Sequence, residues 1–259
     1  MITVILAGGK GSRILEETRE KPKAMVKIGK YTIIEHIMRS YSIQGYQDFL
    51  VLGGYKFEIL LEYYKKTAHC IEYNEESRDY LFSYEDMRIR LLDTGESRGS
   101  AGRLLAASEY LKNDTFLLTY CDAVSSVSIR ELVRFHKDHK ALVTLTAVRP
   151  RPRFGVLKLD NNGQVISMRE KNRMDSPIIN GGFMVAEPGL LNLITSEEME
   201  LEREVLSTIA GTNQLWAYHH EGFWQCMDTI QERDYLCGLF KEGTCPWFCD
   251  NHKNSSRIS

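Results

Sequence analysis

The chain opens with an apolar run that leads directly into a glycine-rich turn, M-I-T-V-I-L-A-G-G-K-G-S-R over residues 1–13. An uninterrupted apolar run bounded by glycines is typical of a strand that is buried on both faces of a parallel sheet. Glycines let backbone N–H groups approach an anion closely, because they carry no Cβ and adopt positive φ at little cost. These residues predict an α/β protein with an anion-binding loop after its first strand.

The pattern beyond the loop divides the chain at about residue 140. Before that point, apolar runs at 2–7, 49–52, 89–92 and 116–120 alternate with amphipathic segments at 32–44, 57–66, 100–111 and 129–139. This alternation predicts a Rossmann-like, mostly parallel sheet with helices on both faces. The later part is richer in strands, at 141–148, 155–159, 165–168, 178–186 and 215–218, with helices at 187–194, 202–210 and 230–240. N-N-G at 161–163 predicts a hairpin turn.

The composition excludes several classes of function. The 259 residues are 43% hydrophobic and 26% charged, as in an ordinary globular protein, and the net charge of -2 provides no basic field for nucleic acid or for a membrane surface. No apolar run approaches the roughly 18 residues of a membrane span. Six scattered cysteines favour a reducing cytoplasm. A zinc site at Cys245 and Cys249 would need two further ligands, and only His252 is close, so we do not expect one.

A second charged motif, E-K-P-K-A-M-V, occupies residues 20–26. Pro22 holds the backbone extended, so Lys23 is not expected on the exposed face of a helix. A lysine fixed beside an anion loop suits a negatively charged transition state, and the planar guanidinium of Arg13 suits phosphate oxygens. The alternative is that the glycines form only a tight turn and that Lys21 and Lys23 solvate a surface loop.

Together, L-A-G-G-K-G-S-R and E-K-P-K-A-M resemble the opening signature of sugar-phosphate nucleotidyltransferases, L-A-G-G-x-G-[ST]-R-L followed by K-P-K or K-P-M. The segments L-L-D-T-G-E-S-R-G-S-A-G-R-L, I-N-G-G-F-M-V and F-W-Q-C-M-D-T are similar to the glucose-1-phosphate cytidylyltransferase branch. The resemblance implies that a cytidylyl group passes from CTP to glucose 1-phosphate with Mg²⁺ as cofactor. It also implies one domain, with a nucleotide-binding half (1–140), a sugar-phosphate-binding and assembly half (141–248), a flexible tail (249–259), and assembly as a homo-oligomer.

The resemblance also assigns roles to individual positions. Arg13 and Lys23 would be catalytic. The nucleotide would be bound by Leu6, Gly8, Gly9, Gly11, Ser12, Arg13, Lys23, Ser100, Gly102 and Arg103. The sugar phosphate would lie against Tyr120, Glu170, Lys171, Asn180 and Gly181. Asp122 and Asp228 would hold Mg²⁺, which proteins usually bind through one or two carboxylates with phosphate oxygens and water. Without the family, each aspartate fits a helix cap as well as a metal ligand. Likewise, N-G-G fits a turn or a bulge as well as a sugar-facing segment.

Three departures from the family pattern leave the substrates open. The family's G-D-G is C-D-A at 121–123, its T-G-G-R-L is S-A-G-R-L at 100–104, and the proline of its E-K-P is replaced by Asn172. Another nucleotide or another phosphorylated acceptor is therefore an alternative, as is a non-catalytic protein that binds sugar nucleotide. The joint presence of the charged residues Arg13, Lys23, Asp122, Lys171 and Asp228 favours catalysis.

Overall fold

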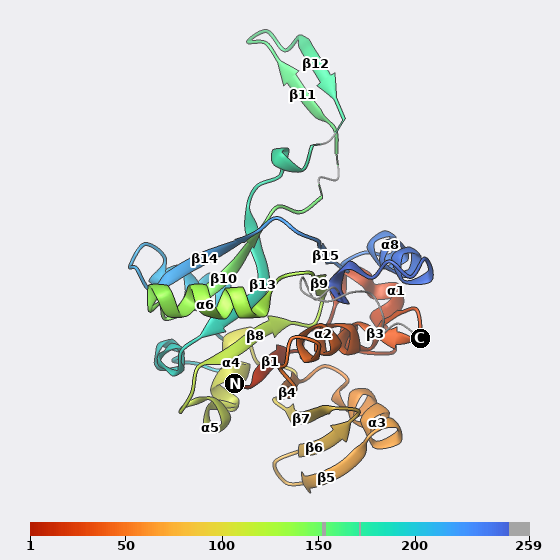
Figure 1. Ribbon diagram of the computed structural model, residues 1–259, viewed down its shortest axis with the longest axis vertical. Helices are drawn as coiled ribbons and strands as arrows, with labels where there is room; N and C mark the ends of the chain where they lie inside the picture. Colours follow the sequence, from red (N-terminus) through yellow and green to blue (C-terminus); the bar gives the residue numbers. More distant parts are fainter. Residues whose placement is uncertain (152–153, 171, 249–259) are drawn as a thin grey trace.

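A mixed sheet of nine strands forms the centre of the molecule (Figure 1). The structure, a computed structural model, describes residues 1–151, 154–170 and 172–248, without the side chain of residue 173. The strand order is β14-β10-β13-β8-β1-β4-β7-β6-β5. β13 and β6 run antiparallel to both of their neighbours, whereas the other neighbouring strands are parallel. The strands are β1 (Thr3–Leu6), β4 (Asp48–Gly53), β5 (His69–Asn74), β6 (Asp79–Tyr84), β7 (Met87–Asp93), β8 (Phe116–Tyr120), β10 (Val143–Val148), β13 (Ile179–Ala186) and β14 (Leu215–His220). The predicted fold class is confirmed.

Each face of the sheet carries its own hydrophobic core. Every residue of β1 is buried, with Ile5 packed on one face and Val4 and Leu6 on the other. Helices α2, α3, α6 and α8 contribute to the first core, and α4, α5 and α7 to the second. The helices are α1 (Leu15–Thr18), α2 (Ile33–Ser42), α3 (Phe57–Thr67), α4 (Ser100–Ala106), α5 (Ser108–Leu111), α6 (Ile129–His139), α7 (Ser207–Ile209) and α8 (Ile230–Lys241). Within the described ranges, none of them has both the length and the apolar character needed to pass through a bilayer.

Several parts of the observed fold differ from the prediction. The hairpin of β5 and β6 is not predicted, because every residue of β5 is exposed and its mixed sequence shows no alternation. Segment 100–111 forms two helices that are separated at Ala107. The helices expected at 187–194 and 202–210 are a 3-10 helix, η4 (Pro188–Leu193), and a π-helix, η5 (Leu201–Leu206), that runs into α7. Apolar spacing does not separate these tighter and wider turns from an α-helix.

A two-stranded hairpin, β11 (Val156–Leu159) and β12 (Val165–Arg169), projects far from the sheet (Figure 1). Its turn is the predicted N-N-G, in which Gly163 has a φ of +87° and its N–H donates to the carbonyl of Asp160 at 3.2 Å. The side chains along both strands are mostly exposed. The hairpin therefore presents apolar residues, such as Leu157 and Met168, outside both cores.

Two short antiparallel ladders lie outside the central sheet. β2 (Lys27–Ile28) pairs with β3 (Tyr31–Thr32), which leads into α2. β9 (Ala123–Ser125) follows β8 and pairs with β15 (Trp224–Cys226), which precedes α8. The second ladder joins the two predicted halves of the chain at the carboxyl end of β8, where ligands bind in sheets of this kind.

Candidate active site

The glycine loop leaves the carboxyl end of β1, as predicted. Gly8 is buried, whereas Gly9 is exposed and a Cβ added to it would meet no atom within 4 Å. Gly11 has a φ of +61° and a ψ of +37°, in the left-handed region that favours glycine. A Cβ on Gly11 would also lie 3.2 Å from the Cβ of Lys23. The loop thus packs closely against the lysine motif and leaves the backbone of Gly9 open to solvent.

Arg103 lies beneath the glycine loop and ties it to neighbouring segments. The residue is only 4% exposed, and its Nη1 donates to the carbonyls of Gly53 at 2.9 Å and Gly95 at 2.7 Å. Its Nη2 donates to the carbonyl of Gly8 at 3.2 Å. A Cβ on Gly8 would overlap the guanidinium, which explains the glycine. Arg103 thus positions the loop, and its predicted contact with the nucleotide stays a prediction.

The start of α4, the other predicted nucleotide-binding segment, is covered by residues 197–200. The N–H of Ser100 donates to the carboxylate of Glu200 at 3.1 Å, and the Ser100 hydroxyl donates to the same oxygen. A Cβ on Gly102 would overlap the carbonyl oxygen of Glu197. Ser100 and Gly102 are therefore engaged by the chain itself, and their nucleotide contacts stay predictions.

Lys23 is buried between two carboxylates. Pro22 is extended, with a φ of −66° and a ψ of 154°, as predicted. The Nζ of Lys23 donates to Oδ2 of Asp122 at 3.2 Å and forms a second ion pair with Asp228. Burial by itself would lower the pKa of Lys23, but the two carboxylates outweigh it and the pKa is raised. The surface interpretation is wrong for Lys23, whereas Lys21 does lie near the surface in an ion pair.

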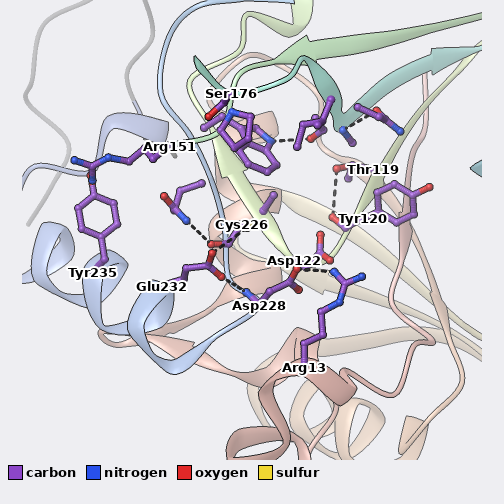
Figure 2. Close-up of a pocket in the computed structure, with 18 of the residues that line it drawn as sticks. Arg13, Thr119, Tyr120, Asp122, Arg151, Ser176, Cys226, Asp228, Glu232 and Tyr235 are labelled. Carbon is purple, nitrogen blue, oxygen red and sulfur yellow. Dashed lines mark hydrogen bonds and ion pairs between the residues drawn. The ribbon is translucent and has the colours of Figure 1, made fainter. Parts of the chain in front are cut away.

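The pairing of β9 with β15 brings Asp122 and Asp228 together (Figure 2). Asp122 immediately precedes β9, and its backbone carbonyl accepts from the N–H of Met227 at 2.8 Å, which extends the ladder by one step. Neither aspartate caps a helix, because Ser128 caps α6 and Thr229 caps α8. The interpretation of these aspartates as helix caps is therefore wrong, and both carboxylates are available to the site.

Asp228 is held from three sides. Nη1 of Arg13 donates to Oδ2 of Asp228 at 2.8 Å, and Lys23 pairs with the other oxygen. Burial would raise the pKa of Asp228, but Lys23 and Arg13 outweigh it and the pKa is lowered. The backbone N–H of Asp228 donates to Glu232 at 2.8 Å, and Glu232 also closes the capping box of α8. These contacts keep the Asp228 carboxylate ionised and fixed.

The two carboxylates fit the requirements of Mg²⁺. Asp122 and Asp228 both lie within ion-pairing distance of one ammonium group, that of Lys23, so they converge on a single positive charge. In the part of the chain that the structure describes, no group of three or more His, Cys, Asp or Glu side chains is placed to hold a metal. Two protein carboxylates completed by phosphate oxygens and water are a usual environment for Mg²⁺. Cys249 and His252, considered above for zinc, lie outside the described residues.

A cavity of about 770 Å³ opens beside the two aspartates (Figure 2). Its walls come from the carboxyl end of β8, the start of β13, β15 and α8. A volume of this size is typical of sites for small-molecule ligands. The cavity brings together six residues of the predicted site, Arg13, Tyr120, Asp122, Asn180, Gly181 and Asp228.

The I-N-G-G segment forms a β-bulge that faces this cavity. The register of β13 against β10 shifts at this point, and Gly182 has a φ of +81°. The N–H of Gly182 donates to Oδ1 of Asn180 at 3.0 Å, and Nε1 of Trp224 donates to the carbonyl of Gly181 at 2.8 Å. Bulges beside active sites often redirect side chains, so the bulge and the ligand-facing interpretations agree here. Trp224 also lines the cavity wall.

Sequence reasoning misses much of the opposite wall. Arg151 lies over the ring of Tyr235, with 4.8 Å between the guanidinium carbon and the ring centroid, and both residues line the cavity (Figure 2). No sequence motif marks either residue, because α8 and the segment after β10 meet only in the folded chain. Other lining residues that were not predicted are Thr119, Ser176, Glu202, Gln225 and Gln231.

The remaining predicted site residues lie away from the cavity or outside the description. Glu170 is exposed directly after the projecting strand β12 and does not line the cavity, because the hairpin carries it away from the sheet. Lys171 lies outside the described residues. The Leu6 side chain packs in the core, which leaves only its backbone for a ligand, and Ser12 is exposed in the 3-10 helix η1 (Ser12–Ile14).

Known proteins resemble the chain over nearly its whole length. The glucose-1-phosphate cytidylyltransferase of Salmonella typhimurium is 42% identical over 256 residues, covering 95% of this chain and 98% of that protein. The probable glucose-1-phosphate cytidylyltransferase of Bacillus subtilis is 33% identical over 253 residues, 95% of this chain and 99% of that protein. HddC from Yersinia pseudotuberculosis, solved in complex with GMP-PN, shares the fold at 19% identity with a TM-score of 0.71, covering 92% of this chain and 99% of that chain. The nucleotidyl transferase model matches residues 2–230, and the chain belongs to the nucleotidyl transferase family.

Proposed function

We propose that the protein transfers the cytidylyl group of CTP to glucose 1-phosphate, forming CDP-glucose and pyrophosphate. The observation that carries the proposal is the convergence of Lys23, Asp122 and Asp228 between a glycine loop and a cavity of ligand size. The names of the relatives that are 42% and 33% identical support the choice of both substrates.

The reaction is a direct displacement at phosphorus. A phosphate oxygen of glucose 1-phosphate attacks the α-phosphorus of CTP, the bond from that phosphorus to the bridging oxygen breaks, and pyrophosphate leaves with the electron pair. The nucleophile is already ionised at neutral pH, so no general base is needed and no proton moves. Catalysis then rests on positioning and on neutralising the phosphate charges.

The residues of the site divide into three roles. The exposed backbone of Gly9, with Gly11 and Arg13, would bind the triphosphate. Lys23, which stays charged because its pKa is raised, would face the reacting phosphates. Asp122 and Asp228 would hold Mg²⁺, which when bound supplies further positive charge to phosphate oxygens. The sugar would occupy the cavity against Tyr120 and Asn180, and by resemblance Lys171 would contact its phosphate.

Pyrophosphate release tests the proposal directly. The protein is incubated with Mg²⁺ and glucose 1-phosphate, and CTP, UTP, dTTP, ATP and GTP are supplied in parallel. Release with CTP alone is the expected result. Release with a different nucleotide would keep the reaction but replace the substrate. No pyrophosphate release with any of the five nucleotides, together with measurable binding of sugar nucleotide, would overturn catalysis in favour of a binding protein.

Variants of Lys23 and Asp122 test the proposed roles of these two residues. Lys23→Ala and Asp122→Asn should each lower kcat by about 10²–10³, by analogy with the removal of one group that stabilises transition-state charge. Lys21→Ala is the matched control, since Lys21 lies two residues away and pairs with Glu17 at 2.9 Å near the surface. Circular dichroism spectra show whether each variant is folded. A Lys23→Ala protein with a near wild-type rate would remove Lys23 from its role.

We also propose that the protein forms a homo-oligomer through the projecting hairpin of β11 and β12. An isolated two-stranded hairpin is marginally stable in water, and this one leaves Leu157 53% and Met168 78% exposed. The resemblance of the C-terminal half to parts used for assembly supports a second copy of the chain as the partner. Light scattering should report a multimer for the wild type and a smaller species for Leu157→Glu. A monomeric wild type would refute this assembly.

A further inference from the structure

Glu202 lies in the wall of the cavity and belongs to no motif that the sequence analysis used. It is the second residue of the π-helix η5, and it shares the cavity with Asp122 and Asp228. Its Oε1 accepts a hydrogen bond from the hydroxyl of Tyr120, which also lines the cavity. In the described part of the chain, its Oε2 makes no hydrogen bond. One oxygen of this exposed carboxylate is therefore left without a donor from the described residues, in a cavity where a ligand is expected.

The backbone that carries Glu202 is fixed on both sides. The N–H of Leu201 donates to the hydroxyl of Ser100 at 2.8 Å, and the Leu201 side chain is fully buried in the core that contains α4. Val205, one turn later, is fully buried in the same core. Two buried anchors fix the backbone between them, and π-helical turns are frequent at functional sites. The backbone of Glu202 is thus held on both sides, while its exposed side chain lines the cavity.

Tyr120 fixes the carboxylate itself. A Cβ on Gly182 would lie 3.0 Å from Cδ2 of Tyr120, so the ring packs closely against the bulge of β13. The phenol hydroxyl of Tyr120 donates to Oε1 of Glu202, so this oxygen of the carboxylate already has a partner. Tyr120 therefore holds one oxygen of Glu202 and leaves the second oxygen available to a ligand in the cavity.

We propose that Glu202 determines acceptor specificity by accepting a hydrogen bond from a ring hydroxyl of the sugar phosphate, with Tyr120 as its positioning residue. An ionised carboxylate only accepts hydrogen bonds, so it recognises a hydroxyl donor and not a phosphate oxygen. The inference rests on the proposed function, because it takes the occupant of the cavity to be the phosphorylated sugar. A hydrogen bond to a charged group is worth about 10-fold to 150-fold in binding.

The test separates the sugar from the nucleotide. We expect Glu202→Gln to raise the KM for glucose 1-phosphate by about 10-fold or more, with the KM for CTP within about twofold of the wild type. Tyr120→Phe should show the same pattern more weakly, because it loosens the carboxylate without removing it. Glu198→Gln is the matched control, since Glu198 is exposed in the preceding segment and its carboxylate accepts from Ser196. Equal losses for CTP and sugar phosphate in Glu202→Gln would overturn the proposal.

Deoxy analogues identify the hydroxyl. We compare glucose 1-phosphate with its 2-, 3-, 4- and 6-deoxy forms. With the wild type, one deoxy form should have a lower kcat/KM than glucose 1-phosphate. With Glu202→Gln, that form and glucose 1-phosphate should have about the same kcat/KM, because the partner of the hydroxyl is already missing. Additive losses for all four analogues would contradict a direct contact. Calorimetric binding of glucose 1-phosphate to both proteins gives a readout without turnover. A wild type that releases no pyrophosphate refutes the proposed function, whereas unchanged binding by Glu202→Gln refutes the role of Glu202 alone.

Discussion

Replacing Gly8 by alanine tests whether Arg103 supports the glycine loop. The new Cβ would overlap the guanidinium, which is nearly inaccessible and donates to the carbonyls of Gly53 at 2.9 Å and Gly95 at 2.7 Å. To make room, the guanidinium has to leave these acceptors. A hydrogen bond to a charged group contributes about 1.5–3 kcal/mol, so the loss of two lowers the unfolding free energy by about 3–6 kcal/mol.

Thermal unfolding followed by circular dichroism measures this loss. For a domain of this size, 1 kcal/mol corresponds to about 2–4 °C, so Gly8→Ala should lower Tm by at least about 6 °C. Gly9→Ala is the matched control, because no atom lies within 4 Å of its new Cβ and its φ lies outside the left-handed region. Its Tm should stay within about 2 °C, while its KM for CTP should rise because the methyl group would lie on the face proposed to bind phosphate. If Gly8→Ala has the same Tm as the wild type, Arg103 does not support the glycine loop.

Three further changes have defined outcomes. Gly102→Ala should lower the unfolding free energy in urea by about 1–3 kcal/mol, because its Cβ overlaps the carbonyl oxygen of Glu197; a gain in stability would contradict this packing. Thr229→Ala should cost about 1 kcal/mol and raise the Mg²⁺ concentration needed for activity, since the cap adjoins Asp228; unchanged Mg²⁺ dependence would separate the cap from the site. Burial lowers the pKa of His36 to about 4, so the folded state binds fewer protons than the unfolded state below pH 6.5. Unfolding free energy should therefore fall by about 2–3 kcal/mol from pH 6.5 to pH 4.5, and an equal fall in His36→Gln would show that another group titrates.

The parts of the site that lie in short stretches of sequence were predictable. The glycine loop follows a strand whose burial is visible as an unbroken apolar run, and Pro22 fixes the backbone next to Lys23. In both cases residue type within about ten positions determines the local conformation. The same holds for N-N-G at the tip of the hairpin, where glycine accepts positive φ.

The other parts depend on contacts between distant segments. The sequence shows that Arg103 is charged and lies in S-A-G-R-L, but only the fold shows that it reaches the glycine loop and donates to backbone carbonyls. Asp122 and Asp228 looked equally like helix caps, because the pairing of β9 with β15 leaves no local pattern. Glu202 was missed for the same reason, since its position depends on a π-helix and on the hydroxyl of Tyr120.

The ladder of β9 and β15 also means that the two aspartates are brought together only late in synthesis. Asp122 emerges well before Asp228, and at about 5–20 residues per second the roughly 100 residues between them take about 5–20 s to synthesise. During that interval the glycine loop, Lys23 and much of the sheet are already present, but the second carboxylate is not. An incomplete chain therefore lacks one of the two carboxylates of the proposed Mg²⁺ site, which is completed only as β15 adds its strand to β9.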